Sequence, residues 1–394
     1  MSHLLARKKS TTSLRRKRSD VGSTAPSSTT PSDQKPRESK SAPYQHARYE
    51  DLLATKGSFM GKYEQGITDA SKKINQSLLQ RQQTLPKDTL FSDYLFEETC
   101  EAIRNRNEAR VIRDISPLIV PSAENFAIRG YTSLRILIES INEGWNNSIP
   151  ITTPRPQPDY SVGFKRSAFT EDQINKLQPF VGELTDTSYF MATYYMYFPF
   201  FASEVKCGAA ALDVADRQNA HSMTLAVRGV VELFRLVKRE KELHREIIAF
   251  SVSHDHRSVR IYGHYPIIDG KKTIFYRHPI HTFDFTALDG KEKWTAYKFI
   301  KNMYDVWMPI HFKRLCSVID ALPTDLNFDV SEGSDLQFSA TSGLSQTLQS
   351  HHLSDAADDD VDLTPLDPQE VTPDTSVTRG SEQTTFKRPK KKRG

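Results

Sequence analysis

The chain has 394 residues, of which 37% are hydrophobic, enough for a sizeable folded core, and its formal net charge of +4 is only mildly basic. Its three cysteines, Cys100, Cys207 and Cys316, lie far apart, which argues against a disulfide framework or a thiolate metal site and suits a reducing compartment. The most membrane-like stretch, residues 189–202, is too short to span a membrane, and the basic N-terminus lacks the apolar core of a signal peptide. We therefore expect a soluble intracellular protein without a membrane partner.

Composition divides the chain into four parts. Residues 1–48 are rich in Ser, Thr, Pro, Lys and Arg, which predicts a disordered basic tail. Residues 49–120 are helical in pattern but polar, which indicates a helical extension, whereas residues 121–323 carry the apolar patterns of a folded domain. Residues 324–394 are acidic up to a final basic run, and we expect a second disordered tail there.

Two helices are expected ahead of the first strand. The first begins after Ser92, which is a suitable N-cap and is followed by apolar residues at helical spacing. The second begins after Ser122 and ends near Gly144, and Leu137 and Ile141 belong to its apolar stripe.

Two strands with a polar insert between them follow. Residues 159–164 form a strand-like run directly after a proline, and residues 194–205 form a continuous aromatic and apolar run, typical of a strand buried on both faces. Within the insert, Thr170 is a suitable N-cap for a short helix. Because side chains alternate along a strand, Glu204 and Lys206 at the end of the second strand share one face.

The remainder of the domain is expected to contain a helix, a ribbon and two more helices. The pattern from about residue 212 to 242 predicts one long amphipathic helix. Residues 246–286 alternate and contain an Asp-Gly hairpin signal at 269–270, which predicts an antiparallel ribbon. An amphipathic helix follows, and we expect Pro309 to break it before a last helix at about 311–322.

Charged residues beside a buried strand indicate a candidate active site. Such residues are rare unless they are paired or bind a ligand, and here Glu204 and Lys206 would lie next to Asp159 of the neighbouring strand. Two carboxylates on adjacent strands offer the hard oxygen ligands that Mg²⁺ prefers. The metal would polarise a phosphodiester, and Lys206 would position the attacking water or stabilise charge on the phosphate. The pattern predicts metal-assisted phosphodiester hydrolysis, with Asp159 and Glu204 as metal ligands and Mg²⁺ as the cofactor.

The tripeptide of an acidic residue, any residue and lysine is weak evidence for an active site by itself. It occurs five times, beginning at Asp33, Glu38, Glu204, Asp269 and Asp289. Only the copy at Glu204 lies on an apolar strand, so its position and not the tripeptide supports the hypothesis.

With a Pro-Asp pair on the preceding strand, this Glu-x-Lys pattern resembles the PD-(D/E)xK nuclease superfamily. The stretches PDYSVGF, FFASEVKCG, DRQNAHSM and SHDHRSVRIYGHY are similar to a fungal family of uncharacterised proteins assigned to that superfamily, over roughly residues 95–323. The resemblance implies an α/β, restriction-endonuclease-like core, in which a mixed central sheet is flanked by helices, with an added antiparallel β-ribbon and C-terminal helices. It also implies a glutamine near the metal, which we place at Gln218, and a further acid from a preceding helix, with Glu124 and Glu139 as candidates.

The ribbon carries basic residues interleaved with aromatic ones, which is typical of a nucleic-acid surface, although ribbons also carry such patterns merely for solubility. The spacing of its five histidines is weak support for a zinc site. The residues expected to bind nucleic acid are Arg257, Arg260, Lys271, Lys272 and Arg277.

Basic clusters occur at both ends of the chain. Residues 7–18 contain two of them, and the C-terminal run resembles a monopartite nuclear-import signal, although either end could instead bind phosphate non-specifically. We expect a nuclear protein whose partners are nucleic acid and an import receptor. The signal would consist of Lys387, Arg388, Lys390, Lys391, Lys392 and Arg393.

The leading hypothesis is a Mg²⁺-dependent nuclease, with DNA favoured as the substrate. The alternative is a catalytically inactive nuclear module that binds nucleic acid or protein on the same fold, because fold does not fix function. The expected metal ligands and the lysine are all present, which favours the enzyme. The sequence contains no Gly-rich phosphate loop, nucleophile elbow or kinase signature, so those classes of enzyme are not supported.

Overall fold

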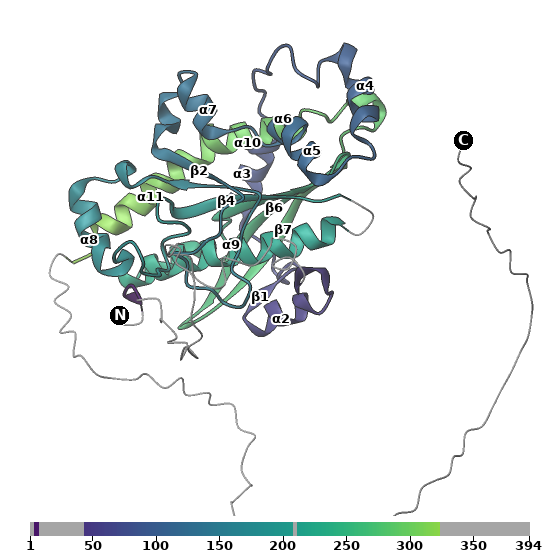
Figure 1. Ribbon diagram of the computed structural model, residues 1–394. Helices are drawn as coiled ribbons and strands as arrows, with labels where there is room; N and C mark the ends of the chain where they lie inside the picture. Colours follow the sequence, from purple (N-terminus) through teal and green to yellow (C-terminus); the bar gives the residue numbers. More distant parts are fainter. Residues whose placement is uncertain (1–3, 8–42, 208–210, 324–394) are drawn as a thin grey trace, which may run out of the picture. The chain divides into compact units, whose positions relative to one another are not determined.

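The computed structural model describes residues 4–7, 43–207 and 211–323, and shows a mixed α/β protein built on one open sheet. The sheet has seven strands in the order β1-β7-β6-β5-β4-β3-β2 (Figure 1). The expected import signal lies outside the described residues, as does most of each expected tail. The strands are β1 (Ser58–Phe59), β2 (Leu137–Ile141), β3 (Tyr160–Phe164), β4 (Tyr197–Val205), β5 (Ala249–His254), β6 (Ser258–Asp269) and β7 (Lys272–Asp284).

The sheet changes direction at its centre. Strands β2, β3 and β4 pair antiparallel, β4 and β5 pair parallel, and β5, β6 and β7 again pair antiparallel. A parallel pair needs a crossover connection, and the long helix α9 (Ala211–Leu236) lies between β4 and β5 in the chain. The carboxyl ends of β4 and β5 therefore meet at the same edge of the sheet.

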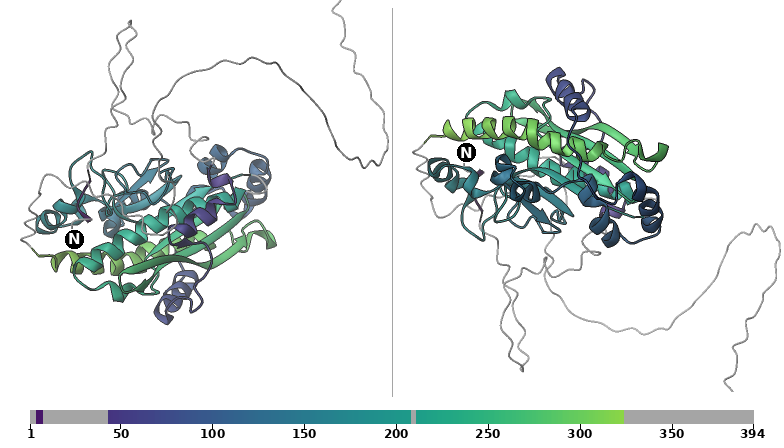
Figure 2. Two further views of the ribbon diagram at one scale, coloured as in Figure 1. Left: turned by 90° about the horizontal axis from the view of Figure 1, so that it is seen from below. Right: turned by 90° about the horizontal axis from the view of Figure 1, so that it is seen from above.

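Helices cover both faces of the central strands. Helix α9 packs along one face of β4, β5 and β6, whereas α10 (Thr295–Asn302), the π-helical turn η6 (Met303–Trp307) and α11 (Met308–Asp320) lie on the other side of the sheet (Figures 1 and 2). Every residue of β4 is buried, as its unbroken apolar run predicts.

Shorter helices precede the antiparallel strands β2, β3 and β4 or connect strands of the sheet. One of them packs against β1 and α9, others pack beside α10 or at the end of β4, and one fills the connection between β3 and β4. They are α2 (Tyr49–Thr55), α3 (Asp69–Gln80), α4 (Asp93–Ile103), α5 (Glu108–Asp114), α6 (Ser116–Ile119), α7 (Ala123–Ile128) and α8 (Glu171–Val181), with the 3₁₀ turns η2 (Thr132–Ile136), η3 (Arg166–Ala168), η4 (Glu240–Leu243) and η5 (Leu288–Gly290).

Several predicted elements are confirmed. Helix α8 begins with a capping box, in which the Thr170 side chain accepts from the Gln173 N–H and the Gln173 side chain accepts from the Thr170 N–H. Asp269 pairs with Lys272 across a hairpin turn in which Gly270 has a φ of 54°, a conformation that glycine adopts at little cost. No helix in the described ranges is long and apolar enough to cross a membrane.

The helix expected from Ser122 to Gly144 is wrong beyond its first two turns. Helix α7 stops at Ile128, the left-handed Gly130 follows with a φ of 104°, and residues 137–141 form β2 beside β3. The apolar spacing of this stretch suits either a helix or an edge strand, and pairing with β3 decides the outcome.

The expected break at Pro309 is also wrong. The π-helical turn η6 joins α10 to α11 without a loop, and Pro309 lies in the first turn of α11. A proline is tolerated there because the first N–H groups of an α-helix have no intrahelical partner.

The folded region begins earlier than the sequence suggests. Tyr44, expected in the N-terminal tail, is buried with Tyr49 and Leu53 against Ala220 of α9. The chain then adds β1 to the β7 edge of the sheet. Residues 4–7 also contact the domain, since Arg7 exchanges two backbone hydrogen bonds with Thr187.

Candidate active site

Three charged side chains meet where β3 begins and β4 ends. Asp159 directly precedes β3, and because Tyr160 pairs with Ser203, Asp159 lies opposite Glu204. The Lys206 Nζ atom lies 3.7 Å from Asp159 Oδ2 and 3.8 Å from Glu204 Oε2. The structure thus brings together the three residues that the sequence singles out.

The register of the sheet directs these side chains toward α9. Glu204 is aligned with Ser253 of β5, whose hydroxyl oxygen accepts a 3.0 Å hydrogen bond from Asn219 of α9. Aligned residues of neighbouring strands share a face, so Glu204 lies on the α9 side. Asp159 Oδ2 accepts a 2.8 Å hydrogen bond from the Val205 N–H, which fixes the start of β3 to the end of β4.

The two carboxylates are almost fully shielded from solvent. Asp159 is 4% exposed and Glu204 is 1% exposed, whereas the Lys206 side chain is 13% exposed. Taking a charge out of water costs several kcal/mol per ion, so such groups need compensating charge. Lys206 supplies one positive charge beside two acids.

A third acid, Glu108, joins the cluster from helix α5. Its Oε1 lies 3.4 Å from Lys206 Nζ, and its side chain is 31% exposed. Asn107 fixes the start of α5 by accepting a hydrogen bond from the Arg110 N–H. No motif surrounds Glu108, and only the packing of α5 at the end of β4 reveals its place.

The two acids proposed from the sequence for that role lie elsewhere. Glu139 accepts hydrogen bonds from the Ser122 hydroxyl, the Glu124 N–H and the Tyr160 hydroxyl, so it joins the start of α7 to β3. Glu124 forms an ion pair of 3.5 Å with Lys165. Neither contacts Lys206 within hydrogen-bonding distance in the described part of the chain.

Gln218 lies in the second turn of α9 and is buried at 8% exposure. Within the described residues its Oε1 has no hydrogen-bond partner, whereas the neighbouring Asn219 donates to the Val252 carbonyl at 2.9 Å. His221, the next polar position, binds the Tyr44 and Tyr49 hydroxyls through Nδ1. Asn219 Oδ1 likewise has no partner among the described residues, so the side-chain oxygens of both Gln218 and Asn219 keep capacity for a ligand.

Neutral groups border the cluster. Burial lowers the pKa of His254 to about 4, so this imidazole is uncharged at neutral pH. Its carbonyl accepts from the Lys206 N–H at 3.1 Å, and its Nε2 lies 3.0 Å from the Ser116 hydroxyl. Burial, followed by the neighbouring Tyr49 and Glu204, raises the pKa of Tyr44 well above its usual value, so that hydroxyl stays protonated.

The expected nucleic-acid surface does not form one patch. Arg260 and Arg277 both pair with the buried Asp216, at 2.7 and 3.7 Å, and Arg257 binds Asp284. Lys271 and its neighbour Lys272 are exposed at the other end of the β6–β7 hairpin from Arg257. The length of β6 places them about 35 Å from Arg257, at roughly 3.3 Å per residue. Each of these three arginines is therefore paired with an acid of the domain.

The carboxylates of this cluster suit a hard divalent cation that takes only part of its ligands from the protein. Among the described residues, no group of three or more His, Cys, Asp and Glu side chains is arranged as a complete metal cage. Mg²⁺ is usually held by only one or two carboxylates, with waters and substrate phosphate as its other ligands. Asp159 and Glu204, with the acid excess that Glu108 adds, fit this partial type of site.

Fold and site together define a mixed α/β protein with a buried centre of carboxylates and one lysine at the edge of its sheet. Residues 95–319 match the family described as Domain of unknown function (DUF7924), which covers more than half of the chain, and the protein belongs to that family. No curated protein matches the chain. The matched segment begins within α4 and includes Glu108, Asp159, Glu204 and Lys206.

Proposed function

We propose that the protein is a Mg²⁺-dependent nuclease of the PD-(D/E)xK type that hydrolyses phosphodiester bonds in nucleic acid, with DNA as the favoured substrate. One observation carries the proposal: the Lys206 ammonium lies within 4 Å of two buried carboxylates on adjacent strands. A cluster built for stability alone would balance its charges, whereas here three acids surround one lysine.

The arrangement of the sheet supports a restriction-endonuclease-like core. The meander β2–β3–β4 is followed by the crossover helix α9 and by β5, which lies parallel to β4. This is a mixed sheet flanked by helices, with β6 and β7 as the added ribbon and α10 and α11 as the C-terminal helices.

Each side chain has a defined role in this mechanism. Asp159 and Glu204 would hold the cation, which would supply a polarised phosphate and a more acidic water. Lys206 lies beside both carboxylates and would stabilise negative charge on the phosphate oxygens, since its Nζ is held near acids on three elements. Glu108, the most exposed of the acids, would orient Lys206 and accept a proton from the attacking water.

A second function is supported by the burial of the site. The hydrogen bond from the Val205 N–H to Asp159, and the 1% exposure of Glu204, would also suit an inactive nuclear module that keeps these residues for stability. In either case we propose a nuclear location, with residues 387–393 as the import signal that an import receptor would bind.

Metal binding and cleavage separate the two functions. We would titrate Mg²⁺ into the full chain by calorimetry and compare it with Asp159→Asn/Glu204→Gln. The matched control is Glu124→Gln, which removes an acid already paired with Lys165 outside the cluster. Binding that disappears only in the double variant, together with Mg²⁺-dependent cleavage of DNA by the wild type, supports the nuclease. Wild-type protein that binds no Mg²⁺, even with DNA present, would favour the inactive module.

A further inference from the structure

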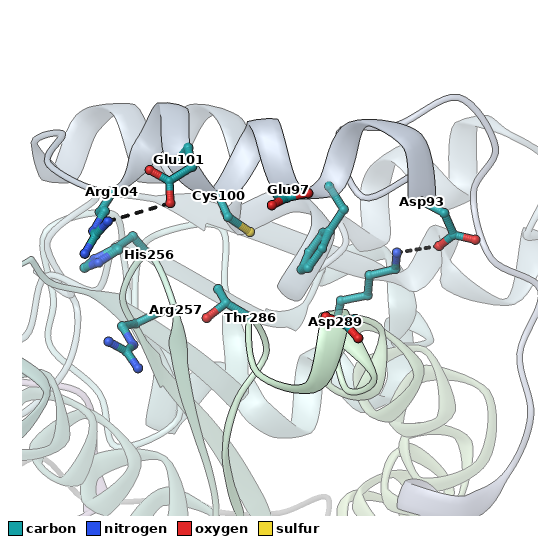
Figure 3. Close-up of a pocket in the computed structure, with 11 residues that line it drawn as sticks. Asp93, Glu97, Cys100, Glu101, Arg104, His256, Arg257, Thr286 and Asp289 are labelled. Atoms are coloured by element: carbon teal, nitrogen blue, oxygen red, sulfur yellow. Dashed lines mark hydrogen bonds and ion pairs between the residues drawn. The ribbon is translucent and has the colours of Figure 1, made fainter.

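A large cavity lies beside the candidate active site, between α4 and the turn that joins β5 to β6 (Figure 3). Its volume is about 730 Å³, within the range of sites that enclose small ligands. Thr286 and Asp289, which follow β7, line the side opposite α4, and Cys100 and Thr286 lie between two charged ends (Figure 3). None of the acids of the active-site cluster lines it.

The chain connects this cavity to the cluster at two points. Arg104, in the cavity wall, precedes Glu108 by four residues, and His256 follows His254, whose carbonyl accepts from the Lys206 N–H. Strand β6 lies two strand spacings from β4, about 10 Å at roughly 4.8 Å per spacing.

One end of the cavity gathers basic side chains, with Glu101 beside them. Arg104, His256 and Arg257 lie together there (Figure 3). Arg257 uses Nε and Nη2 on Asp284, which leaves other N–H donors of its guanidinium for a ligand. Arg104 is paired only loosely, at 3.7 Å from Glu101, and both of those side chains are about two-thirds exposed. Arginine forks of this kind suit a phosphate group.

The other end has an excess of acid. Lys293 lies there, but its Nζ is 2.6 Å from Asp93 and 4.5 Å from the centre of the Phe96 ring, so its charge is engaged. Two further acids line the cavity from opposite sides, Glu97 on α4 and Asp289 on η5 (Figure 3). Carboxylates repel a continuing phosphate chain, whereas they accept hydrogen bonds from base amino groups such as N4 of cytosine.

The backbone holds this acidic end in an unusual conformation. Leu288, Asp289 and Gly290 have consecutive φ angles of 52°, 55° and 75°, all left-handed. Such a conformation costs a non-glycine residue on the order of 1–3 kcal/mol and is found preferentially at ligand sites. A Cβ at position 290 would collide with the Phe96 ring, so glycine is required to bring this turn against α4.

We propose that the cavity receives the terminal nucleotide of a single nucleic-acid strand. Its phosphate would bind Arg104, His256 and Arg257, and the amino edge of its base would face Glu97 and Asp289. The nucleic-acid strand ends at the acidic end of the cavity, so the protein acts close to the termini of nucleic-acid strands. The position of the cut rests on the proposed nuclease function, whereas recognition of the end does not.

Binding to linear and circular DNA tests the proposal. We would use the full chain carrying Glu204→Gln and measure fluorescence anisotropy with a short single-stranded oligonucleotide and with the same sequence ligated into a circle. We expect the linear form to bind at least about tenfold more tightly. Oligonucleotides phosphorylated at the 5′ or the 3′ end identify which end is bound.

Variants of the cavity then localise the effect. Arg104→Ala/Arg257→Ala should abolish the preference for linear DNA, and Arg257→Lys, which can still pair with Asp284, controls for a loss of folding. Lys271→Ala/Lys272→Ala removes the same charge at the far end of the hairpin and should leave the preference unchanged. Asp289→Asn suits the left-handed backbone and should raise the affinity for the circle.

Equal affinity for circular and linear DNA would overturn the proposal, and so would a preference for linear DNA that survives Arg104→Ala/Arg257→Ala. These outcomes are separate from those of the nuclease test. Wild-type protein that cleaves linear and circular DNA equally keeps the nuclease function and removes the role of the cavity. Protein that prefers ends but never cleaves keeps the role of the cavity and removes the enzyme.

Discussion

Two clusters of charged side chains lie beside helix α9, and they differ in their balance of charge. In the first, Asp159, Glu204 and Glu108 surround the single Lys206. The second consists of Asp213 and Asp216 with Arg260 and Arg277, two acids and two bases, and the Tyr262 hydroxyl also donates to Asp216. A balanced cluster neutralises its own charge, whereas an acid-rich one retains attraction for a cation. The difference separates a structural site from a candidate catalytic one.

The largest effect is expected from Glu204→Gln. This change removes a charge but almost no volume, so we expect metal-dependent cleavage to fall by about 10²–10³-fold while the fold is kept. The rate of DNA cleavage and the thermal unfolding midpoint would be measured together. Unchanged activity in this variant would end the assignment of the site.

Acid pH should destabilise the domain through the buried neutral histidine that lies near each cluster. Burial lowers the pKa of His254 to about 4 and that of His264 to about 3, below the ordinary value near 6.5. The unfolded chain therefore takes up protons first as the pH falls. The stability from each histidine is complete above about pH 6.5 and is lost toward pH 4, by about 3 kcal/mol each.

Urea unfolding between pH 7.5 and 4.5 would measure this slope, with the range chosen around the ordinary histidine pKa of about 6.5. His254→Asn and His264→Asn should each make the slope shallower to a similar degree. A wild-type protein equally stable across the range would contradict the prediction.

Breaking the balanced cluster should cost stability and not activity. Asp216→Asn leaves the Arg260 and Arg277 side chains, 27% and 13% exposed, without their shared acid. We expect the free energy of unfolding to fall by about 2 kcal/mol, less than for a fully buried pair because Arg260 is partly solvated. Cleavage measured below the unfolding transition should match the wild type. A larger loss of cleavage than of stability would place Asp216 in the active site.

The smallest effect on the folded domain is expected from deletion of residues 386–394. Stability and cleavage should not change, because both clusters lie within residues 95–319. Nuclear accumulation of a fluorescent fusion should decrease, as expected for loss of a basic import signal. An unaltered distribution would show that this run is not the signal.

The sequence predicts the part of the site that depends on local periodicity. Asp159, Glu204 and Lys206 come together because the alternation of a strand and the pairing of two strands place them so. Glu108 could not be found in this way, since its position depends on how α5 packs. The pairing of Arg260 with Asp216 was equally hidden, because 44 residues separate the two partners along the chain.

The fold shows the same division. The fully buried β4, the capping box of α8 and the hairpin at Gly270 follow from short-range signals. The apolar residues of strand β2 satisfy both the helical and the strand period, and only its contact with β3 selects the strand. Edge elements are the least determined by their own residues.

Strand β1 determines where a truncated fragment of this protein should begin. It pairs with β7 at one margin of the sheet, yet it lies about forty residues before the segment by which the family is recognised. A fragment cut at residue 95 would leave the backbone N–H and C=O groups of β7 bare, and such margins recruit strands from other molecules. Precipitation of that fragment would then result from the loss of β1, and a fragment that begins at residue 43 would keep β1 paired with β7.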